Sequence, residues 1–248
     1  MKQSPTEELN QKNLPIDKLT INDSFKFMIE DQLNAIKAVD KQIKKINQII
    51  KVLVNHFQKN NSGRLVYCGA GTSGRVGVQD AVELYPTFGW PRRNINFIIA
   101  GGKQALTKAI ENSEDDIVSA RESVKKINIS DKDVVFGLTA SGNTSFTCEV
   151  MRSARINKAL TIGISNNPNG KMHYLCDYHI LLNTKAEVVA GSTRLKAGTA
   201  QKVCLNIIST ILMTKLGFVK EGYMINLVPS NEKLRKRKKL IAEILNKK

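Results

Sequence analysis

Short apolar segments alternate with helical patterns through the middle of the chain, and this alternation restricts the fold more than any other feature. Five segments have the length and apolar character of buried strands. They are "RLVYCGAG", "NINFIIAGG", "DVVFGLTAS", "ALTIGISN" and "YHILLNT". Helices are expected over about 73–84, 103–126, 144–157 and 195–216. Strands alternating with helices lie mostly parallel and are covered on both faces. We therefore expect an α/β fold with a doubly wound, mostly parallel five-stranded sheet.

A long helix is expected before the first strand. Residues 1–22 have the composition of a loosely ordered arm, and Asn22, Asp23 and Ser24 then offer N-cap chemistry for a helix over about 23–58. Apolar residues follow each other along this helix in helical steps. They are Leu33, Ile36, Val39, Ile43, Ile46, Ile50, Leu53 and Phe57. So long a stripe must be buried against the domain or against a second subunit.

These patterns divide the chain into three expected parts. Residues 1–62 form the arm and the long helix, residues 63–226 form the α/β domain, and residues 227–248 form a basic helical tail. No apolar run approaches the roughly 20 residues that span a bilayer, and the N-terminus has no apolar signal core. The four cysteines form no C-x-x-C pair, which argues against a disulfide framework or a zinc site. We expect a soluble protein of the reducing cytoplasm, without membrane contact.

The chain carries a formal net charge of +16. The segment "EKLRKRKKLIAEILNKK" contributes a large share of this charge, and the rest is spread thinly. Nucleic-acid binders more often interleave basic and aromatic residues or contain a recognisable module, and neither is present. We therefore expect a solvated helical surface rather than a nucleic-acid site; a protein that binds nucleic acid through this tail is the weaker alternative.

The stretch "GAGTSGR" follows the first strand and has the spacing G-x-G-x-x-G. A dinucleotide site also needs an acidic residue at the end of the second strand, but that strand ends "FIIAGGK". The loop instead supplies the hydroxyls of Thr72 and Ser73 and several backbone N–H groups at a helix N-terminus. This combination favours a bound anion.

Two further hydroxyl-rich stretches precede helices. "ASGNTS" follows the third strand, and "GSTRLKAGTAQK" opens the last long helix. One such turn is usually only a helix cap. Three in one domain favour a phosphate or polyhydroxyl ligand, and none has the form of a nucleotide P-loop.

Two glutamates lie near the hydroxyl-rich stretches in the sequence and are candidates for a catalytic role. Glu83 follows Ser73 by ten residues in "DAVELYPTFGW", and Glu114 lies in the acidic cluster "ENSEDD". An isolated glutamate on a helix is usually solvated surface, so the residues alone make Glu83 the better catalytic candidate and Glu114 the lesser one. The three histidines, His56, His173 and His179, share no motif.

The motifs occur together in a distinctive order. "GAGTSGRVGVQDAVELYPTFG", "ENSEDD", "DVVFGLTASGNTS", "GSTRLKAGTAQK" and "NEKLRKRKKLI" follow one another, and "TEELN" lies in the arm. From about residue 6 to about residue 241, the chain closely resembles the N-acetylmuramic acid 6-phosphate etherases of the SIS (sugar isomerase) superfamily. The resemblance implies a SIS fold and a homodimer.

The resemblance also implies a carbon–oxygen lyase. Such an enzyme cleaves the D-lactyl ether of N-acetylmuramic acid 6-phosphate by elimination and then hydration, giving N-acetylglucosamine 6-phosphate and D-lactate. Glu83 corresponds to the acid–base residue for ether cleavage, and Glu114 corresponds to the glutamate assigned to water addition. No metal or organic cofactor is implied. The implied substrate-binding residues are Thr72, Ser73, Ser141, Asn143, Thr144, Ser192 and Thr193.

The chain departs from the family in two places. The family usually has "ASGRTPY" where this chain has "ASGNTSF", so Asn143 replaces an arginine, Ser145 a proline and Phe146 a tyrosine. Asparagine cannot copy the bidentate hydrogen bonds of a guanidinium. The family also usually continues into a small C-terminal helical domain beyond the "NEKL" stretch. Both departures support the alternative of a weakened or inactive phosphosugar-binding regulator.

Overall fold

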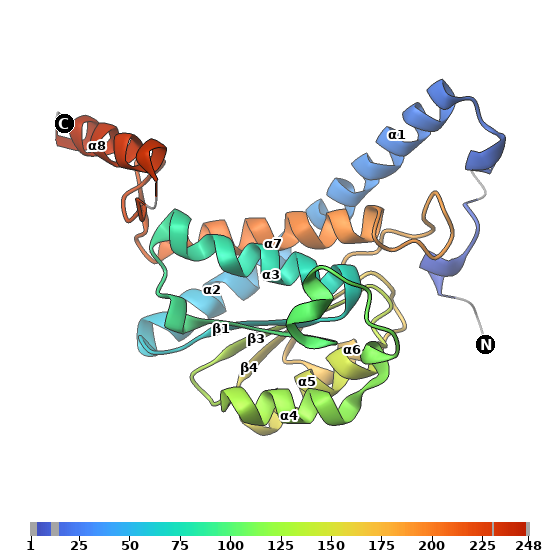
Figure 1. Cartoon of the computed structure of the whole chain (residues 1–248), viewed down its shortest axis with the longest axis horizontal. Helices are drawn as coiled ribbons and strands as arrows, with labels where there is room; N and C mark the ends of the chain where they lie inside the picture. The colour runs from blue at the N-terminus through green and yellow to red at the C-terminus, as the bar shows by residue number, and fades with distance from the viewer. Residues whose placement is uncertain (1–3, 11–14, 230, 247–248) are drawn as a thin grey trace.

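A parallel sheet forms the centre of the computed structural model, which describes residues 4–10, 15–229 and 231–246. Its five strands run in the order β2-β1-β3-β4-β5, and every neighbouring pair is parallel (Figure 1). The strands are β1 (Leu65–Gly69), β2 (Ile95–Ile99), β3 (Val134–Thr139), β4 (Leu160–Ser165) and β5 (Tyr178–Leu181). All five lie inside the segments that the sequence predicts, and the doubly wound fold class is confirmed.

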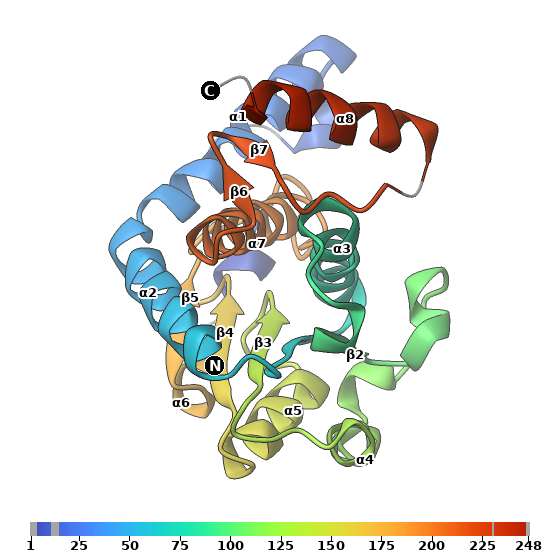
Figure 2. The ribbon, with the colours of Figure 1, turned by 90° about the vertical axis from the view of Figure 1, so that its left-hand side faces the viewer.

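Helices cover both faces of the sheet. One layer holds α2 (Ile43–Lys59), α3 (Gly71–Phe88) and α7 (Lys196–Lys215), and the other holds α4 (Ile117–Ile127), α5 (Ser145–Ile156) and the short α6 (Met172–Leu175) (Figure 2). Each layer buries its own apolar cluster against the sheet. A small antiparallel pair, β6 (Val219–Lys220) and β7 (Tyr223–Met224), and α8 (Glu232–Asn246) follow α7.

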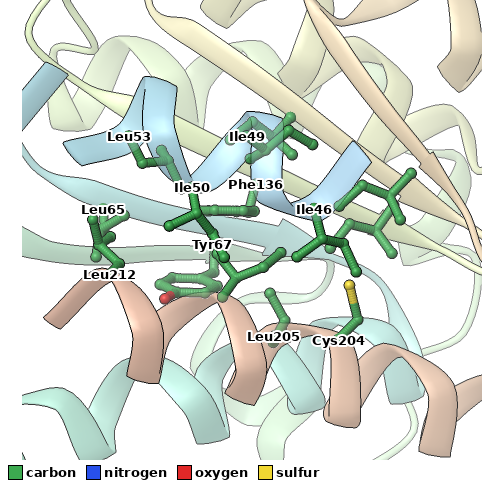
Figure 3. Packing of buried hydrophobic residues seen from close by; sticks show 14 of the residues in the cluster. Ile46, Ile49, Ile50, Leu53, Leu65, Tyr67, Phe136, Cys204, Leu205 and Leu212 are labelled. Carbon is green, nitrogen blue, oxygen red and sulfur yellow. The ribbon is translucent and has the colours of Figure 1, made fainter. Parts of the chain in front are cut away.

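The larger cluster lies between the sheet, α2 and α7 (Figure 3). Tyr67 of β1 stacks on Phe136 of β3, with ring centroids 5.4 Å apart. The hydroxyl of Tyr67 donates to the buried carboxylate of Asp80, which also accepts from Asn206 and Ser209. The polar tip of Tyr67 is therefore satisfied at the junction of β1, α3 and α7.

The N-terminal helical region is two helices rather than the single helix predicted over about 23–58. Helix α1 (Ile21–Asp40) begins earlier than predicted because the Thr20 side chain accepts from the Asp23 amide as the N-cap. The chain then turns at Lys41 and Gln42, where the Gln42 amide bonds to the Val39 carbonyl, and α2 begins at Ile43. The turn lets α2 pack on the sheet while α1 extends away from it (Figure 1).

Because of this break, only part of the predicted apolar stripe is buried. Five of its members are buried: Val39, Ile46, Ile50, Leu53 and Phe57. The other three, Leu33, Ile36 and Ile43, are more than half exposed. Leu33 and Ile36, together with residues not assigned to the stripe, leave an exposed apolar row on α1. The row comprises Ile21, Phe25, Ile29, Leu33 and Ile36.

The prediction of a helix over about 103–126 is also wrong for the first half of that range. Short 3-10 turns occupy Gly102–Leu106 and Ser113–Asp115, and α4 begins only at Ile117. The chain leaves helical geometry at Asn112, whose φ is +56°. The Asp116 side chain then caps α4 by accepting from the Ser119 amide.

The arm predicted over 1–22 to be loosely ordered is docked at Thr6, whereas most of residues 15–22 are exposed. Thr6 is 1% exposed, its amide donates to Asn167 Oδ1, and its hydroxyl accepts from Asn167 Nδ2 at 2.9 Å. Residues 1–3 and 11–14 of this prediction, and 230 and 247–248 of the predicted tail, lie outside the described residues.

Other expectations can be compared directly with the structure. All four cysteines are free, as predicted, and all are buried; the basic tail is helical over α8. Among the described helices, none combines the length and apolar character of a membrane span.

Candidate functional site

The turn from β1 into α3 brings two backbone segments into very close contact. A Cβ atom on Gly69 would lie 2.8 Å from the Gly74 amide nitrogen, and one on Gly74 would lie 2.8 Å from the Gly69 carbonyl oxygen. Gly71 has a φ of +52°. The glycines of "GAGTSG" thus fold the chain back on itself, and α3 begins directly beyond the strand.

The first turn of α3 holds Thr72 and Ser73. Within the described residues, neither side-chain hydroxyl makes a hydrogen bond, although Ser73 is only 8% exposed. Arg75 anchors the same turn, because its guanidinium donates to the carbonyls of Ala105 and Lys108 at 2.9 and 3.0 Å. The loop therefore combines unengaged hydroxyls with a helix N-terminus, which together suit an anion.

The turn after β3 is built differently, on a network of side-chain hydroxyls. Thr139 Oγ1 lies 2.8 Å from Thr144 Oγ1 and 3.3 Å from Ser141 Oγ, and it accepts from the Gly142 amide. Gly142 has a φ of +74°, and a Cβ there would lie 2.8 Å from the Cα of Gly170. The hydroxyls of this turn bond to one another.

Two of the three residues that depart from the family in this turn have polar partners within the chain. Asn143 Oδ1 accepts from the Lys171 amide at 3.0 Å, and the Asn143 side-chain amide lies 3.4 Å from the Ser141 carbonyl. Ser145 Oγ donates to Asp115 Oδ1 at 3.1 Å, which links α5 to the acidic cluster. The third departure, Phe146, is 1% exposed and belongs to the core.

Ser192 and Thr193 precede α7 and are half-buried. This stretch adjoins the first loop, because a Cβ on Gly198 would lie 3.1 Å from Thr72 Cγ2. The N-terminus of α7 itself is capped by Glu187, whose carboxylate accepts from the amides of Lys196 and Ala197 at 3.0 and 2.8 Å. Burial raises the pKa of Glu187, and these two amides act in the opposite direction. A ligand at this stretch must therefore use side chains rather than these two amides.

Sequence reasoning missed the roles of Glu187 and Thr6. Glu187 lies nine residues before Lys196, outside the usual N-cap positions, and Thr6 meets Asn167 across 161 residues. Neither pairing has a local sequence signal. The segment "TEELN", which contains Thr6, was notable in the sequence only because it resembles the family.

The structure treats the two candidate glutamates differently. Glu114 lines a cavity of about 270 Å³ together with Gly71 and Arg75 of the first loop. Glu83 is exposed on α3, ten residues beyond Ser73. At a rise of about 1.5 Å per residue, it lies roughly 15 Å farther along the helix axis. The chain thus brings Glu114, but not Glu83, to the first loop.

A metal ion needs a set of suitable ligands. Over the described ranges, no group of three or more His, Cys, Asp or Glu side chains is placed to hold one. The three loops offer hydroxyls, amides, backbone N–H groups and basic side chains such as Arg75 and Arg194, the usual partners of an oxyanion.

Protein-family models and curated proteins match most of the chain. The model of the glucokinase regulatory protein N-terminal SIS domain matches residues 44–155, and the SIS domain model matches residues 115–210. The N-acetylmuramic acid 6-phosphate etherase of Shouchella clausii (strain KSM-K16) is 42% identical over 236 residues, which is 95% of this chain and 79% of that protein. The etherase of Bacillus thuringiensis subsp. konkukian (strain 97-27) is 41% identical, with 80% of it covered.

This chain belongs to the N-acetylmuramic acid 6-phosphate etherase family. Solved structures with lower identity share the fold. Phosphoheptose isomerase of Neisseria gonorrhoeae superposes with a TM-score of 0.59 at 16% identity, covering 79% of this chain and 100% of that chain. The Vibrio vulnificus NanR protein complexed with ManNAc-6P superposes with a TM-score of 0.54 at 14% identity, covering 92% and 70%. The predicted SIS fold is confirmed.

Proposed function

We propose that this chain cleaves the D-lactyl ether of N-acetylmuramic acid 6-phosphate and releases D-lactate and N-acetylglucosamine 6-phosphate. The observation that carries the proposal is 42% identity to an etherase over 95% of the chain, with Glu83 and Glu114 both present in the matching motifs. The hydroxyl-rich loops at the carboxyl edge of the sheet suit a phosphorylated sugar.

The 6-phosphate would bind first at the turn from β1 into α3. Thr72 and Ser73 have unengaged hydroxyls there, and the helix N-terminus adds backbone N–H groups and its positive dipole end. Ser141, Asn143 and Thr144 would reach the ligand from the turn after β3. Ser192 and Thr193 would reach it from the stretch before α7, which adjoins Thr72.

The chemistry needs an acid–base group and an electron sink. In the open-chain sugar, the C2 proton is acidic because it lies next to the C1 aldehyde. Its removal and the departure of lactate from C3 give an unsaturated aldehyde, to which water then adds at C3. We assign Glu83 to protonation of the departing lactate oxygen and Glu114 to the water-addition half. Such proton transfers typically contribute about 10²–10⁴-fold in rate.

The distance between Ser73 and Glu83 along α3 supports a homodimer in which two subunits share each active site. A separation of roughly 15 Å between Ser73 and Glu83 exceeds the length of one hexose 6-phosphate. We therefore propose that Glu83 of one subunit completes the site of its partner. Glu83 is exposed on α3. The helical layer that contains α3 is the one from which α1 and α8 project (Figures 1 and 2). The exposed apolar row on α1 would be covered by the second copy, whose contact also explains why that row is apolar.

We also propose that the reaction takes place in the cytoplasm, since four unpaired cysteines suit a reducing compartment. The alternative function is a phosphosugar-binding regulator. It would bind N-acetylmuramic acid 6-phosphate without releasing lactate.

A single assay separates these two functions. The purified chain is incubated with N-acetylmuramic acid 6-phosphate and free D-lactate is measured; release at an enzymatic rate supports the etherase. Glu83→Gln keeps the shape but cannot act as an acid at neutral pH, so it should lower the rate about 100-fold or more while substrate still binds. Glu122→Gln changes an exposed glutamate of α4 outside the proposed site and should turn over like the parent.

Mixing two inactive variants tests the shared site. Glu83→Gln lacks the acid, and Ser73→Asp places a like charge at the phosphate loop. If the sites are composite, each mixed dimer contains one intact site, and random exchange restores roughly a quarter of the parental activity. A mixture that stays inactive, although the two chains demonstrably exchange, would place both groups in the site of one subunit.

A further inference from the structure

A second cavity meets the hydroxyl-rich stretches only at Lys196, in the first turn of α7. It has a volume of about 630 Å³ and is enclosed by the arm, by α1 and by the segment 183–186 that follows β5. None of the candidate catalytic or substrate-binding residues lines it. The cavity is large enough for a monosaccharide phosphate, and its polar lining is distinctive.

A buried ion pair forms the inner wall of this cavity. Lys196 Nζ donates to Asp31 Oδ1 and to the Ala186 carbonyl, both at 2.6 Å, and the side chains of Lys196 and Asp31 are each 4% exposed. Over the described residues, Asp31 Oδ2 has no hydrogen-bond partner. An ammonium group has three N–H donors, and these two contacts use two of them.

This wall offers an acceptor and a donor side by side. Leaving a buried carboxylate oxygen without a partner is costly, so the site favours a group that donates to Asp31 Oδ2. The third N–H of Lys196 favours a group that also accepts. A hydroxyl does both with a single oxygen atom, whereas a bare phosphate or carboxylate oxygen cannot donate to Asp31.

The rim of the cavity is positively charged. It is lined by Lys37 from the last turn of α1, Lys41 just beyond that helix and Lys185 from the loop after β5, opposed by the carboxylate of Glu8. All three lysines are exposed, and the described part of the chain places none of them in an ion pair. The balance at the rim therefore favours an anionic group on the ligand.

We propose that this cavity is a second ligand site, separate from the proposed catalytic site, and that it binds a small anion carrying a hydroxyl group: a phosphosugar or a hydroxy acid. The hydroxyl binds between Asp31 and Lys196, and the phosphate or carboxylate faces the lysine rim. The site spans α1 and the start of α7, which are also joined by Thr199 Oγ1 donating to Gln32 Oε1 at 2.6 Å. A bound ligand thus holds α1 against α7.

Calorimetric titration of the full chain tests this site with three probes: N-acetylglucosamine 6-phosphate, D-lactate and inorganic sulfate, which carries no proton to donate at neutral pH. The two hydroxylated anions distinguish the possible sources of ligand, and at least one of them should bind the cavity. For N-acetylglucosamine 6-phosphate, which also fits the catalytic site, cavity binding gives two molecules per chain. Sulfate should bind the cavity at least tenfold more weakly than the preferred probe.

The variant Lys37→Gln/Lys185→Gln removes two rim charges from exposed positions, so the fold is expected to remain intact. It should weaken cavity binding roughly tenfold and leave lactate release unchanged. Lys44→Gln removes an exposed charge from α2 outside the cavity and should bind like the parent. The proposal is overturned if neither hydroxylated probe loses affinity in the double variant, or if sulfate binds the cavity as tightly as the preferred probe. Because lactate release is assayed separately, failure of this site and failure of the proposed activity are distinguishable.

Discussion

The two turns that follow β1 and β3 differ in how they hold their hydroxyls. After β1, the turn is shaped by a close backbone crossing between Gly69 and Gly74, and the hydroxyls of Thr72 and Ser73 bond to no described residue. After β3, Thr139 binds the hydroxyls of Ser141 and Thr144. One turn is kept in shape by its backbone, and the other by side chains that would also be needed for a ligand.

Because of this difference, fold stability and ligand binding depend on different residues in the first turn and on the same residues in the second. In the first turn, the glycines determine the fold and the hydroxyls are free to bind, so the two roles can be changed independently. In the second turn, a ligand must compete with bonds already made within the chain. The first turn is therefore the stronger anion site, although the sequence marked both turns in the same way.

The largest expected effect is on the backbone crossing. Gly74→Ala places a Cβ 2.8 Å from the Gly69 carbonyl oxygen and 2.8 Å from Ile99 Cγ1. Relieving the first contact requires the backbone of β1 or α3 to shift, which costs free energy. We expect a loss of about 1–3 kcal/mol in the free energy of unfolding, measured by chemical denaturation. Gly71→Asn is the matched control, because Asn tolerates a φ of +52° and the Cβ meets nothing within 4 Å. Equal stability of both variants would contradict the described crossing.

The next effect concerns ligand binding by the two turns. Ser73→Ala removes an unengaged hydroxyl and should weaken binding of N-acetylglucosamine 6-phosphate at the catalytic site about five- to tenfold. Ser141→Ala removes a hydroxyl that already bonds within the chain, and we expect a change of about twofold or less. Calorimetry on both variants makes the comparison, and a larger loss for Ser141→Ala would reverse our ranking of the turns.

The smallest effect tests the departure in the second turn. Asn143→Arg restores the residue usual in the family and could offer an anionic ligand two charge-assisted hydrogen bonds. Half of one such bond gives roughly a threefold rise in kcat/KM. Against this gain, Asn143 would lose its contact with the Lys171 amide.

The triple variant Asn143→Arg/Ser145→Pro/Phe146→Tyr controls for this loss, because it restores the usual family loop. If neither variant changes binding or turnover while the parent is active, this turn does not contact the ligand. The assignment of Ser141 and Thr144 to the substrate would then be withdrawn.

The sequence predicts the sheet and its loops well because those signals are local. Five apolar runs identify the strands, and glycines beside hydroxyls identify the turns. The break at Lys41 and Gln42 has no proline or glycine, and it depends on α2 packing against the sheet. The loss of helix near Asn112 likewise follows from a left-handed residue that sequence periodicity does not reveal.

The site was only partly predictable for the same physical reason. The sequence identifies candidate hydroxyls and glutamates individually, but it does not predict their hydrogen-bond partners. The Asn143 contact with Lys171 spans 28 residues, and the Glu187 cap depends on where the loop before α7 folds. Whether Ser73 is unengaged and Ser141 engaged is a property of the tertiary structure alone.

The most direct test of the proposed reaction is to run it in H₂¹⁸O and analyse both products by mass spectrometry. Elimination followed by hydration breaks the bond between C3 and the lactyl oxygen, so solvent oxygen must enter the sugar. We predict one ¹⁸O atom at C3 of N-acetylglucosamine 6-phosphate and unlabelled D-lactate. Label in the lactate, or binding of the substrate with no lactate released, would contradict the proposed function.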